Sequence, residues 1–298
     1  MLQDALIGLK MKKRRIGCFG KFLIILLIAA IPVIIIIIDS NTRLVTKEYE
    51  LFYDNLPEAF EGYRIVLLAD LHGTEHGEDN KRLVERVKEA RPDIIVFSGD
   101  MIDRYQPGRP VRTQLETARV LVRQLVQIAP VYFVTGNHEW DSGIVRDLFE
   151  MLEENDVIVL RNQYRRLSIG SESIILAGID DPGGPADMIK PDEFINNINR
   201  NENFDFLMVM VHRNYNLRSL SELGVDLILS AHAHGGMVRL PFTDGLVGPS
   251  MEFFPTYTSG IYTQGNTNMV VTQGLGNHFG WTRFLNNPQV VVVELKAG

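Results

Sequence analysis

The stretch 93–103 constrains the fold most, because it combines a buried strand with a carboxylate delivered to a surface. Its residues 94–97 are Ile, Ile, Val and Phe, which have the length and β-branched content of a strand covered on both faces. Ser98 and Gly99 then end the strand, and Asp100 follows. One Asp after one strand is common in proteins and indicates little by itself.

The same pattern recurs four more times along the chain. Apolar runs at 65–69, 131–135, 206–211 and 227–231 each lead into Asp, Asn or His. Five of the seven histidines follow such runs: His72, His138, His212, His232 and His234. Because ligands gather beyond the carboxyl ends of the strands in α/β sheets, we expect these side chains to converge on one site.

An apolar segment at 22–38 runs for seventeen residues without a charge, which is near the short end of a membrane-spanning helix. The alternatives are a cleaved signal peptide and a buried core helix. A signal peptide needs a small-residue cleavage site, whereas Ile34 to Ile38 continue directly into Asp39. A core helix would not be apolar on every face. We therefore predict an uncleaved transmembrane anchor.

The charges around this segment predict its orientation and one class of partner to exclude. Residues 1–21 carry six positive charges and one negative, so a total of −7 leaves −12 for residues 22–298. The positive-inside tendency places 1–21 in the cytoplasm as a basic tail and 39–298 outside, as one extracytoplasmic domain. So acidic a domain is a poor partner for nucleic acid. Cys18, the sole cysteine, precedes the span, so the outer domain has no disulfide and no thiolate ligand.

The order of expected elements indicates an α/β domain. Up to residue 155 the pattern alternates strand and helix, which is typical of a parallel sheet: strands 41–51, 64–69, 94–97 and 131–135, and helices 79–90, 113–128 and 143–155. Strands at 157–160, 164–169 and 173–178, separated by short turns, predict a second, β-rich sheet. The remaining expectations are a helix at 191–199, strands at 206–211, 225–230, 269–272 and 290–295, and a surface excursion at 249–268.

The side chains at the strand ends favour a metal site. Asp, Asn and His without thiolate suit Mn, Fe or Zn. One carboxylate can bridge two such cations about 3.5 to 4 Å apart, and the pair can ionise a shared water and clamp a phosphoryl group. Asp70 and His72, like His232 and His234, are two residues apart, so each pair points to one side of an extended segment.

Five sequence blocks resemble the signature blocks of the calcineurin-like metallophosphoesterases. They are Asp70-Leu71-His72, Gly99-Asp100-Met101-Ile102-Asp103, Gly136-Asn137-His138-Glu139, a lone His212, and His232-Ala233-His234. The segments 56–62, 212–213 and 235–242 are similar to the bacterial membrane-anchored branch of that family, and the likeness covers about residues 48–296. The resemblance implies a four-layer αββα sandwich, two mixed β-sheets flanked by helices, preceded by the transmembrane helix.

The resemblance also implies an activity and a set of site residues. The activity is hydrolysis of phosphomono- or phosphodiesters by a metal-bound hydroxide, with two divalent ions as cofactors. The first ion would be held by Asp70, His72, Asp100 and His234. The second would be held by Asp100, Asn137, His212 and His232, with Asp100 as the bridge. His138 would donate to the leaving oxygen, and Asp103 would orient the His138 imidazole.

Two positions depart from the family pattern. Ala231 stands where the family usually has Gly, which costs about 1 kcal/mol or more and displaces His232 if φ is positive, and nothing if φ is negative. Ala231 motivates the alternative that the chain is a catalytically weak or inactive metal- or phosphate-binding protein of the same fold. Asn214 stands where Pro is common, and without that Pro the loop after His212 is expected to be less rigid.

The expected substrate is a phosphoester, and the anchor indicates which kind. A site held close to the bilayer, with many aromatic residues from Phe253 to Phe284, favours a lipid-linked or envelope phosphoester as a hypothesis. His278, with Phe279 and Trp281, is a candidate part of the substrate wall.

Overall fold

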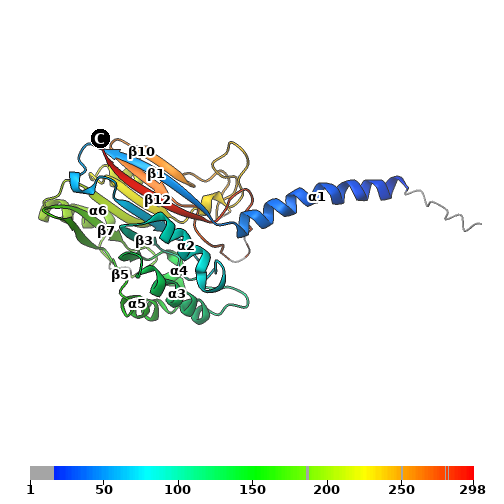
Figure 1. Cartoon of the computed structure of the whole chain (residues 1–298), viewed down its shortest axis with the longest axis horizontal. Helices are drawn as coiled ribbons and strands as arrows, with labels where there is room; N and C mark the ends of the chain where they lie inside the picture. The colour runs from blue at the N-terminus through cyan, green and yellow to red at the C-terminus, as the bar shows by residue number, and fades with distance from the viewer. Residues whose placement is uncertain (1–16, 186–187, 250, 279, 281) are drawn as a thin grey trace, which may run out of the picture.

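The computed structural model describes residues 17–185, 188–249, 251–278, 280 and 282–298 (Figure 1). Most of the predicted basic tail, and the aromatic residues Phe279 and Trp281, lie outside the described residues. The described chain forms one long helix followed by two packed β-sheets with helices on both outer faces (Figure 1).

Helix α1 (Cys18–Thr42) leaves the body of the molecule at one end, with its apolar side chains exposed (Figure 1). Its most apolar 18-residue window has a mean hydropathy of 3.2, and none of that window is buried. Over the part of the chain that the structure describes, α1 is the one helix long and apolar enough to cross a membrane. The predicted span 22–38 lies inside it.

The strand predicted at 41–51 begins later than expected. Side-chain bonds from Asn41 Nδ2 to the Ile37 carbonyl (2.7 Å) and from Thr42 Oγ1 to the Ile38 carbonyl (2.7 Å) favour one more helical turn. The strand β1 therefore spans Val45–Tyr53.

The first sheet has six strands in the order β1-β12-β2-β3-β4-β5. Besides β1 they are β2 (Arg64–Leu68), β3 (Ile94–Ser98), β4 (Val131–Val134), β5 (Ile158–Val159) and β12 (Gln289–Ala297). The β12 strand pairs antiparallel to β2, and the other pairs are parallel, so the sheet is mixed. The assignment of 157–160 to the second sheet was wrong, because Ile158 and Val159 pair in parallel with Tyr132 and Phe133 of β4.

The second sheet also has six strands, in the order β10-β11-β9-β8-β7-β6. They are β6 (Gln163–Ile169), β7 (Glu172–Ile179), β8 (Leu207–Arg213), β9 (Leu227–Ala231), β10 (Gly260–Gln264) and β11 (Thr267–Val271). The surface excursion predicted at 249–268 was wrong from residue 260 onward. The β10 strand is a half-exposed edge strand with polar residues Tyr262, Thr263 and Gln264, so it has no apolar run to mark it.

Alternating side chains bind the layers together. Ile65 and Leu67 of β2 pack between the two sheets against Met208 and Leu229 of the second sheet. Val66 and Leu68, on the other face of β2, pack under the helices of the first sheet. Helices α2 (Lys81–Ala90), α3 (Val111–Leu125) and α5 (Val145–Glu153) cover that face, and α6 (Pro191–Asn201) and α7 (Leu217–Ser221) cover the second sheet. The four layers confirm the αββα sandwich.

Candidate metal centre

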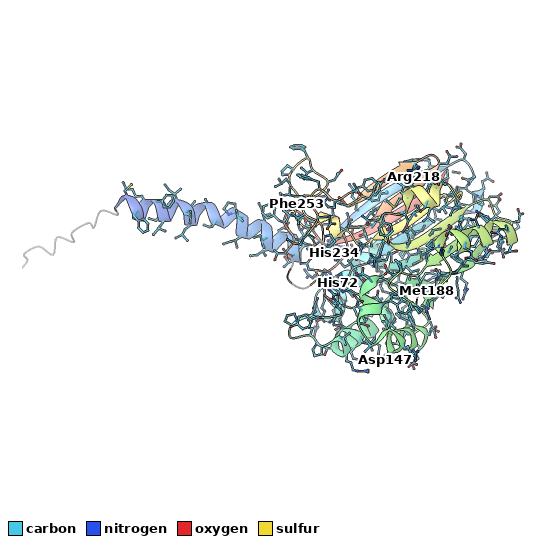
Figure 2. All side chains as sticks on the ribbon, turned by 180° about the vertical axis from the view of Figure 1, so that it is seen from behind. His72, Asp147, Met188, Arg218, His234 and Phe253 are labelled. Atoms are coloured by element: carbon cyan, nitrogen blue, oxygen red, sulfur yellow. The ribbon has the colours of Figure 1, made fainter. Side chains whose placement is uncertain are left out.

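The predicted site residues occupy the loops that follow five strands. Asp70 and Asp100 each stand two residues beyond a strand, β2 and β3 respectively. Asn137 begins the short helix α4 (Asn137–Asp141), which follows β4. His212 lies at the end of β8, and His232 follows β9 directly. The structure brings these residues together at one end of the sandwich, the end from which α1 leaves (Figure 2).

The side chains form two groups, each with the geometry of a metal-ligand cluster. In the first group, Nε2 of His72 lies 3.0 Å from Nε2 of His234, which lies 3.7 Å from Oδ1 of Asp70. In the second group, Nε2 of His212 lies 3.1 Å from Nδ1 of His232. Imidazole nitrogens that face one another in this way, together with carboxylate oxygens, form a donor set suited to divalent cations.

Asp100 stands between the two groups. Its Oδ2 lies 3.2 Å from Nε2 of His212 and 3.7 Å from Nε2 of His72. One carboxylate oxygen therefore reaches a ligand-type nitrogen on either side, which is the position of a bridging ligand.

Buried oxygens without partners support a cation at both groups. Among the residues that the structure describes, Oδ1 of Asp70 and Oδ1 of Asn137 are buried and accept no hydrogen bond. A buried polar atom left unpaired costs about 1 to 3 kcal/mol, so native proteins rarely leave one without a partner. Both atoms belong to predicted ligands, and the residues present fit the two ions that the sequence implies.

The pKa values in the cluster also favour the binding of cations. Burial, together with the negative charge of Asp100, raises the pKa of Asp70 to about 7, because two carboxylates share this interior. Burial lowers the pKa of His72 and of His232 to about 3, so both imidazoles are neutral with a lone pair to offer. Burial disfavours a charged His212, but the nearby Asp100 carboxylate outweighs it and raises the pKa of His212 to about 10. A bound cation would replace that proton as the partner of Asp100.

The backbone at the candidate ligands is strained. Five of them have positive φ: Asp70 (51°), His72 (48°), Asp100 (54°), His232 (71°) and His234 (47°). Left-handed backbone costs a non-glycine residue about 1 to 2 kcal/mol, and such residues cluster at functional sites. This strain occurs at the positions where the backbone turns the candidate ligands toward one another.

Two glycines allow the loops to approach one another. A Cβ at Gly99 would lie 2.5 Å from the backbone nitrogen of Gly136 and 2.8 Å from Nδ1 of His212. A Cβ at Gly136 would overlap Oδ1 of Asp100. A larger residue at Gly136 would therefore displace the candidate bridge, and one at Gly99 would push apart the loops that carry Gly136 and His212.

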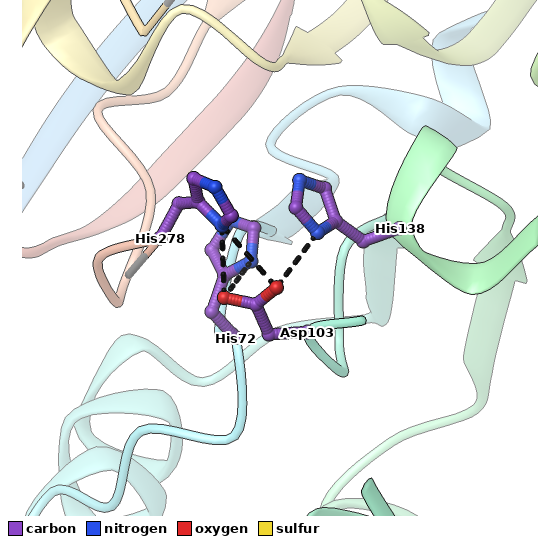
Figure 3. Close-up of side chains that lie close together, drawn as sticks. All are labelled: His72, Asp103, His138 and His278. Carbon is purple, nitrogen blue, oxygen red and sulfur yellow. Dashed lines mark hydrogen bonds and ion pairs between the residues drawn. The ribbon is translucent and has the colours of Figure 1, made fainter. Parts of the chain in front are cut away.

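A second feature of the site is the Asp103 carboxylate, which lies beside three imidazoles (Figure 3). Nδ1 of His72 lies 3.8 Å from Oδ2 of Asp103. Nδ1 of His138 lies 2.9 Å from Oδ1 of Asp103, and Nδ1 of His278 lies 3.0 Å from Oδ2 of the same residue. The His138 and His278 rings are 4.7 Å apart between centroids. Burial lowers the pKa of His138, but the hydrogen bond to Asp103 and the nearby acidic charges outweigh it and leave this pKa raised. Asp103 therefore favours the charged form of His138.

Glu139 ties two of the site's loops together, a role that the sequence did not reveal. Its carboxylate accepts hydrogen bonds from the backbone nitrogens of Gly136 (2.7 Å), Asp100 (2.8 Å) and Met101 (2.7 Å). The side chain is fully buried. The only available signal was its place in the Gly-Asn-His-Glu block, which does not show what the carboxylate contacts.

Arg283 lies behind the first group as a fully buried guanidinium. Its Nε donates to Oδ1 of Asn277 (2.6 Å), and its Nη2 donates to the Gly276 carbonyl (2.7 Å) and lies 3.4 Å from Nδ1 of His234. Burial lowers the pKa of Arg283 to about 10, which leaves it charged at neutral pH. Its buried hydrogen bonds give Arg283 a structural role behind His234.

The amino-acid sequence was compared with those of known proteins and protein families. Residues 63–236 match the family model described as calcineurin-like phosphoesterase. An uncharacterized metallophosphoesterase of Bacillus subtilis (strain 168), YkuE, is 30% identical over 258 residues, which is 85% of this chain and 85% of its own length. The chain belongs to the calcineurin-like phosphoesterase family.

Two further matches, one relative in sequence and one solved structure, come from Danio rerio. A transmembrane protein with metallophosphoesterase domain is 27% identical over 300 residues, covering 94% of this chain and 64% of that protein. The crystal structure of a dimetal phosphatase aligns with 72% of this chain and 88% of its own, at a TM-score of 0.41 and 12% identity. Membership of the calcineurin-like family implies metal-dependent hydrolysis of phosphoesters.

The structure answers the two questions raised by the departures from the calcineurin-like pattern. Ala231 ends strand β9 and is not among the residues with positive φ, so its methyl group costs nothing there and the motive for an inactive protein disappears. Asn214 donates from Nδ2 to the carbonyls of Thr256 (3.1 Å) and Tyr257 (2.9 Å). These bonds restrain the loop after His212 in the absence of a proline.

Proposed function

We propose that the chain is a membrane-anchored phosphoesterase that uses two divalent metal ions to hydrolyse phosphomono- or phosphodiesters. The observation that carries the proposal is the arrangement of Asp100 between two groups of buried ligand-type side chains, 3.2 Å from His212 and 3.7 Å from His72. A third group of possible ligands among the described residues, His72, Asp103, His138 and His278, shares His72 with the first group.

The residues that would hold each ion follow from the two groups. Asp70, His72 and His234 would hold one ion, and His212, His232 and Asn137 the other, with Asp100 shared. When bound, such ions lower the pKa of a water molecule and neutralise charge on phosphoryl oxygens. Mn, Fe and Zn all suit this donor set.

The chain's own contribution to proton transfer would come from His138. Its Nδ1 is held by Asp103, so the ring is fixed and Nε2 faces the reaction space, 4.0 Å from Oδ2 of Asp100. In its protonated form, His138 can donate from Nε2 to the leaving oxygen of the ester. Asp103 acts as a positioning residue that stabilises the imidazolium.

The membrane part of the proposal rests on α1. We place the spanning segment at 22–38, with residues 1–21 in the cytoplasm and the domain 39–298 outside, because the basic residues precede the span. The Danio rerio relative, which is named as a transmembrane protein, supports the anchoring. The site lies at the α1 end of the domain, which favours an ester linked to a lipid of the same membrane (Figure 2).

The test combines metal content with hydrolysis. The full chain in detergent, supplied with Mn, should contain two ions per chain and hydrolyse bis-p-nitrophenyl phosphate. Asp100→Asn should lose at least one ion and about a hundredfold or more in rate, since each metal supplies several kcal/mol of transition-state stabilisation. The matched control is Asp147→Asn, because Asp147 is a surface acid paired with Arg112. This control should leave the metal content and the hydrolysis rate unchanged. Activity that survives chelation or the Asp100→Asn change would refute the two-metal proposal.

A further inference from the structure

An exposed apolar loop lies beside the site, at the end of the domain from which α1 leaves. We define the apolar loop as the described residues 240–249 and 251–257. Its large side chains project into solvent: Phe242 (108% exposed), Phe253 (71%), Phe254 (68%) and Met251 (65%). Several large apolar side chains exposed in one loop can mark a site that contacts a protein or a membrane. Figure 2 places Phe253 level with the root of α1, near His234.

The exposure does not come from a lack of local structure. Within the loop, Gly248 donates to the Glu252 carbonyl (2.8 Å), Met251 to the Gly248 carbonyl (3.0 Å) and Phe254 to the Leu246 carbonyl (3.0 Å). Backbone hydrogen bonds thus fold the loop on itself and leave its phenyl rings outside. A surface that is structured and apolar is ready to contact an apolar partner.

Hydrogen bonds connect the base of the loop to the last turn of α1. Arg239 donates from its backbone nitrogen to the Phe284 carbonyl (2.9 Å), and Phe284 donates to the Met237 carbonyl (3.1 Å). The neighbouring Arg283 exchanges bonds with Asn41 of α1, at 2.9 and 3.1 Å. Residues 283–284 therefore link the base of the loop to Asn41, in the last turn of α1.

The loop carries no Lys or Arg, and its charges are Asp244 and Glu252. Such a surface does not fit an anionic partner, whereas apolar side chains beside a membrane helix fit the acyl region of a bilayer. We infer that the apolar loop is a second membrane contact, which inserts its phenyl rings into the bilayer that holds α1. This inference rests on the proposed anchoring by α1.

The two contacts together define the substrate class of the same site. The root of α1 and the apolar loop lie at the end of the domain that holds the metal centre, so this end faces the bilayer surface (Figure 2). The ester that reaches it is a lipid phosphoester whose acyl chains stay in the membrane. The loop thus acts as a docking surface for the membrane that contains the substrate.

The contact is measured with single cysteines in the full chain. Cys18→Ser removes the sole cysteine, and Phe253→Cys, Leu27→Cys or Ile169→Cys each adds one for an environment-sensitive fluorophore. The proteins are reconstituted in phosphatidylcholine vesicles with or without brominated acyl chains. Leu27 reports the anchor. Ile169 is exposed in the β6–β7 turn, at the opposite end of the second sheet from the candidate ligands, and is the matched control.

The inference predicts quenching by brominated lipid at 253 and at 27, and none at 169. A label at 253 that behaves like the label at 169, while 27 is quenched, would overturn the loop contact and leave the anchor intact. Shielding from water at 253 without lipid quenching would also overturn it, because it indicates a protein partner. An unquenched label at 27 would refute the anchoring itself.

A rate measurement tests the substrate class separately. Phe253→Ser combined with Phe254→Ser should leave hydrolysis of bis-p-nitrophenyl phosphate unchanged. The same pair should lower, severalfold or more, the release of nitrophenol from the p-nitrophenyl ester of phosphatidic acid in phosphatidylcholine vesicles. Equal rates for the parent and the double variant on the vesicle substrate would overturn the role of the loop, whereas loss on both substrates would indicate damage to the metal centre.

Discussion

Oδ1 of Asp103 lies 2.9 Å from Nδ1 of His138, so the ring that faces the candidate metal centre is held from behind by a buried carboxylate. The contact fixes the orientation of the ring and favours its protonated form. The same carboxylate holds His278 through its other oxygen, at 3.0 Å (Figure 3). Two imidazoles beside the reaction space therefore depend on one side chain.

Asp103→Asn is expected to lower kcat for ester hydrolysis by about tenfold or more, because an amide stabilises an imidazolium poorly, while correctly placed acid-base groups contribute about a hundredfold or more. Metal content should not change. Steady-state kinetics with metal analysis of the same preparations check this. A variant that loses its metals would show that Asp103 supports the ligands instead.

The leaving group separates the roles of His138 and His278. His138→Ala should slow hydrolysis of an alkyl phosphoester by about a hundredfold, and that of a nitrophenyl ester far less, because nitrophenolate leaves without a proton. His278→Ala should slow the hydrolysis of both esters less, since His278 lies beside the site and contacts Asp103 and the His138 ring. Rates for a series of leaving groups measure the difference. Equal losses across the series for His138→Ala would contradict its role as proton donor.

Glu139→Gln is expected to destabilise the protein by about 1 to 3 kcal/mol, because the amide group cannot accept all the backbone bonds that the carboxylate accepts from Gly136, Asp100 and Met101. Denaturant unfolding measures the loss. Glu89→Gln, an exposed residue on α2, is the control and should stay within about 0.5 kcal/mol of the parent. An unchanged stability for Glu139→Gln would show that the loops are held by other contacts.

Metal removal should lower the melting temperature. Ions that bind only the folded state add about 2.7 kcal/mol at a hundredfold excess over Kd, and in a domain of this size each kcal/mol shifts Tm by about 2 to 4 °C. Scanning calorimetry with and without chelator measures the shift. Asp70→Asn should reduce it, because that substitution removes a predicted ligand. An identical Tm in both conditions would speak against ions bound in the folded state.

The sequence predicted the layers and the loops of the site well, for a physical reason. Strands buried on both faces, such as residues 94–97, need continuous apolar runs, and the polar side chains that follow them mark where the backbone reaches the surface. The helices 113–128 and 191–199 also formed within a few residues of their predicted ends, because their apolar spacing is strongly periodic.

Other features left no pattern in the sequence. The two-residue strand β5 joins the first sheet through its pairing with β4, and no property of Ile158 or Val159 selects one sheet over the other. The edge strand β10 is stabilised by pairing with β11 and not by burial, so its composition resembles a loop. The contacts of Glu139 and Asn41 are made across long sequence separations, which local patterns do not encode.

The bonds between Asn41 and Arg283 join the last turn of α1 to the folded domain. Asn277 donates to the same Asn41 oxygen at 2.7 Å, and the next residue is His278. A protease that cut between α1 and β1 would therefore separate the domain from these partners, and the segment around His278 would lose one of its restraints. Cleavage there would change contacts next to the candidate site as well as separate the domain from α1.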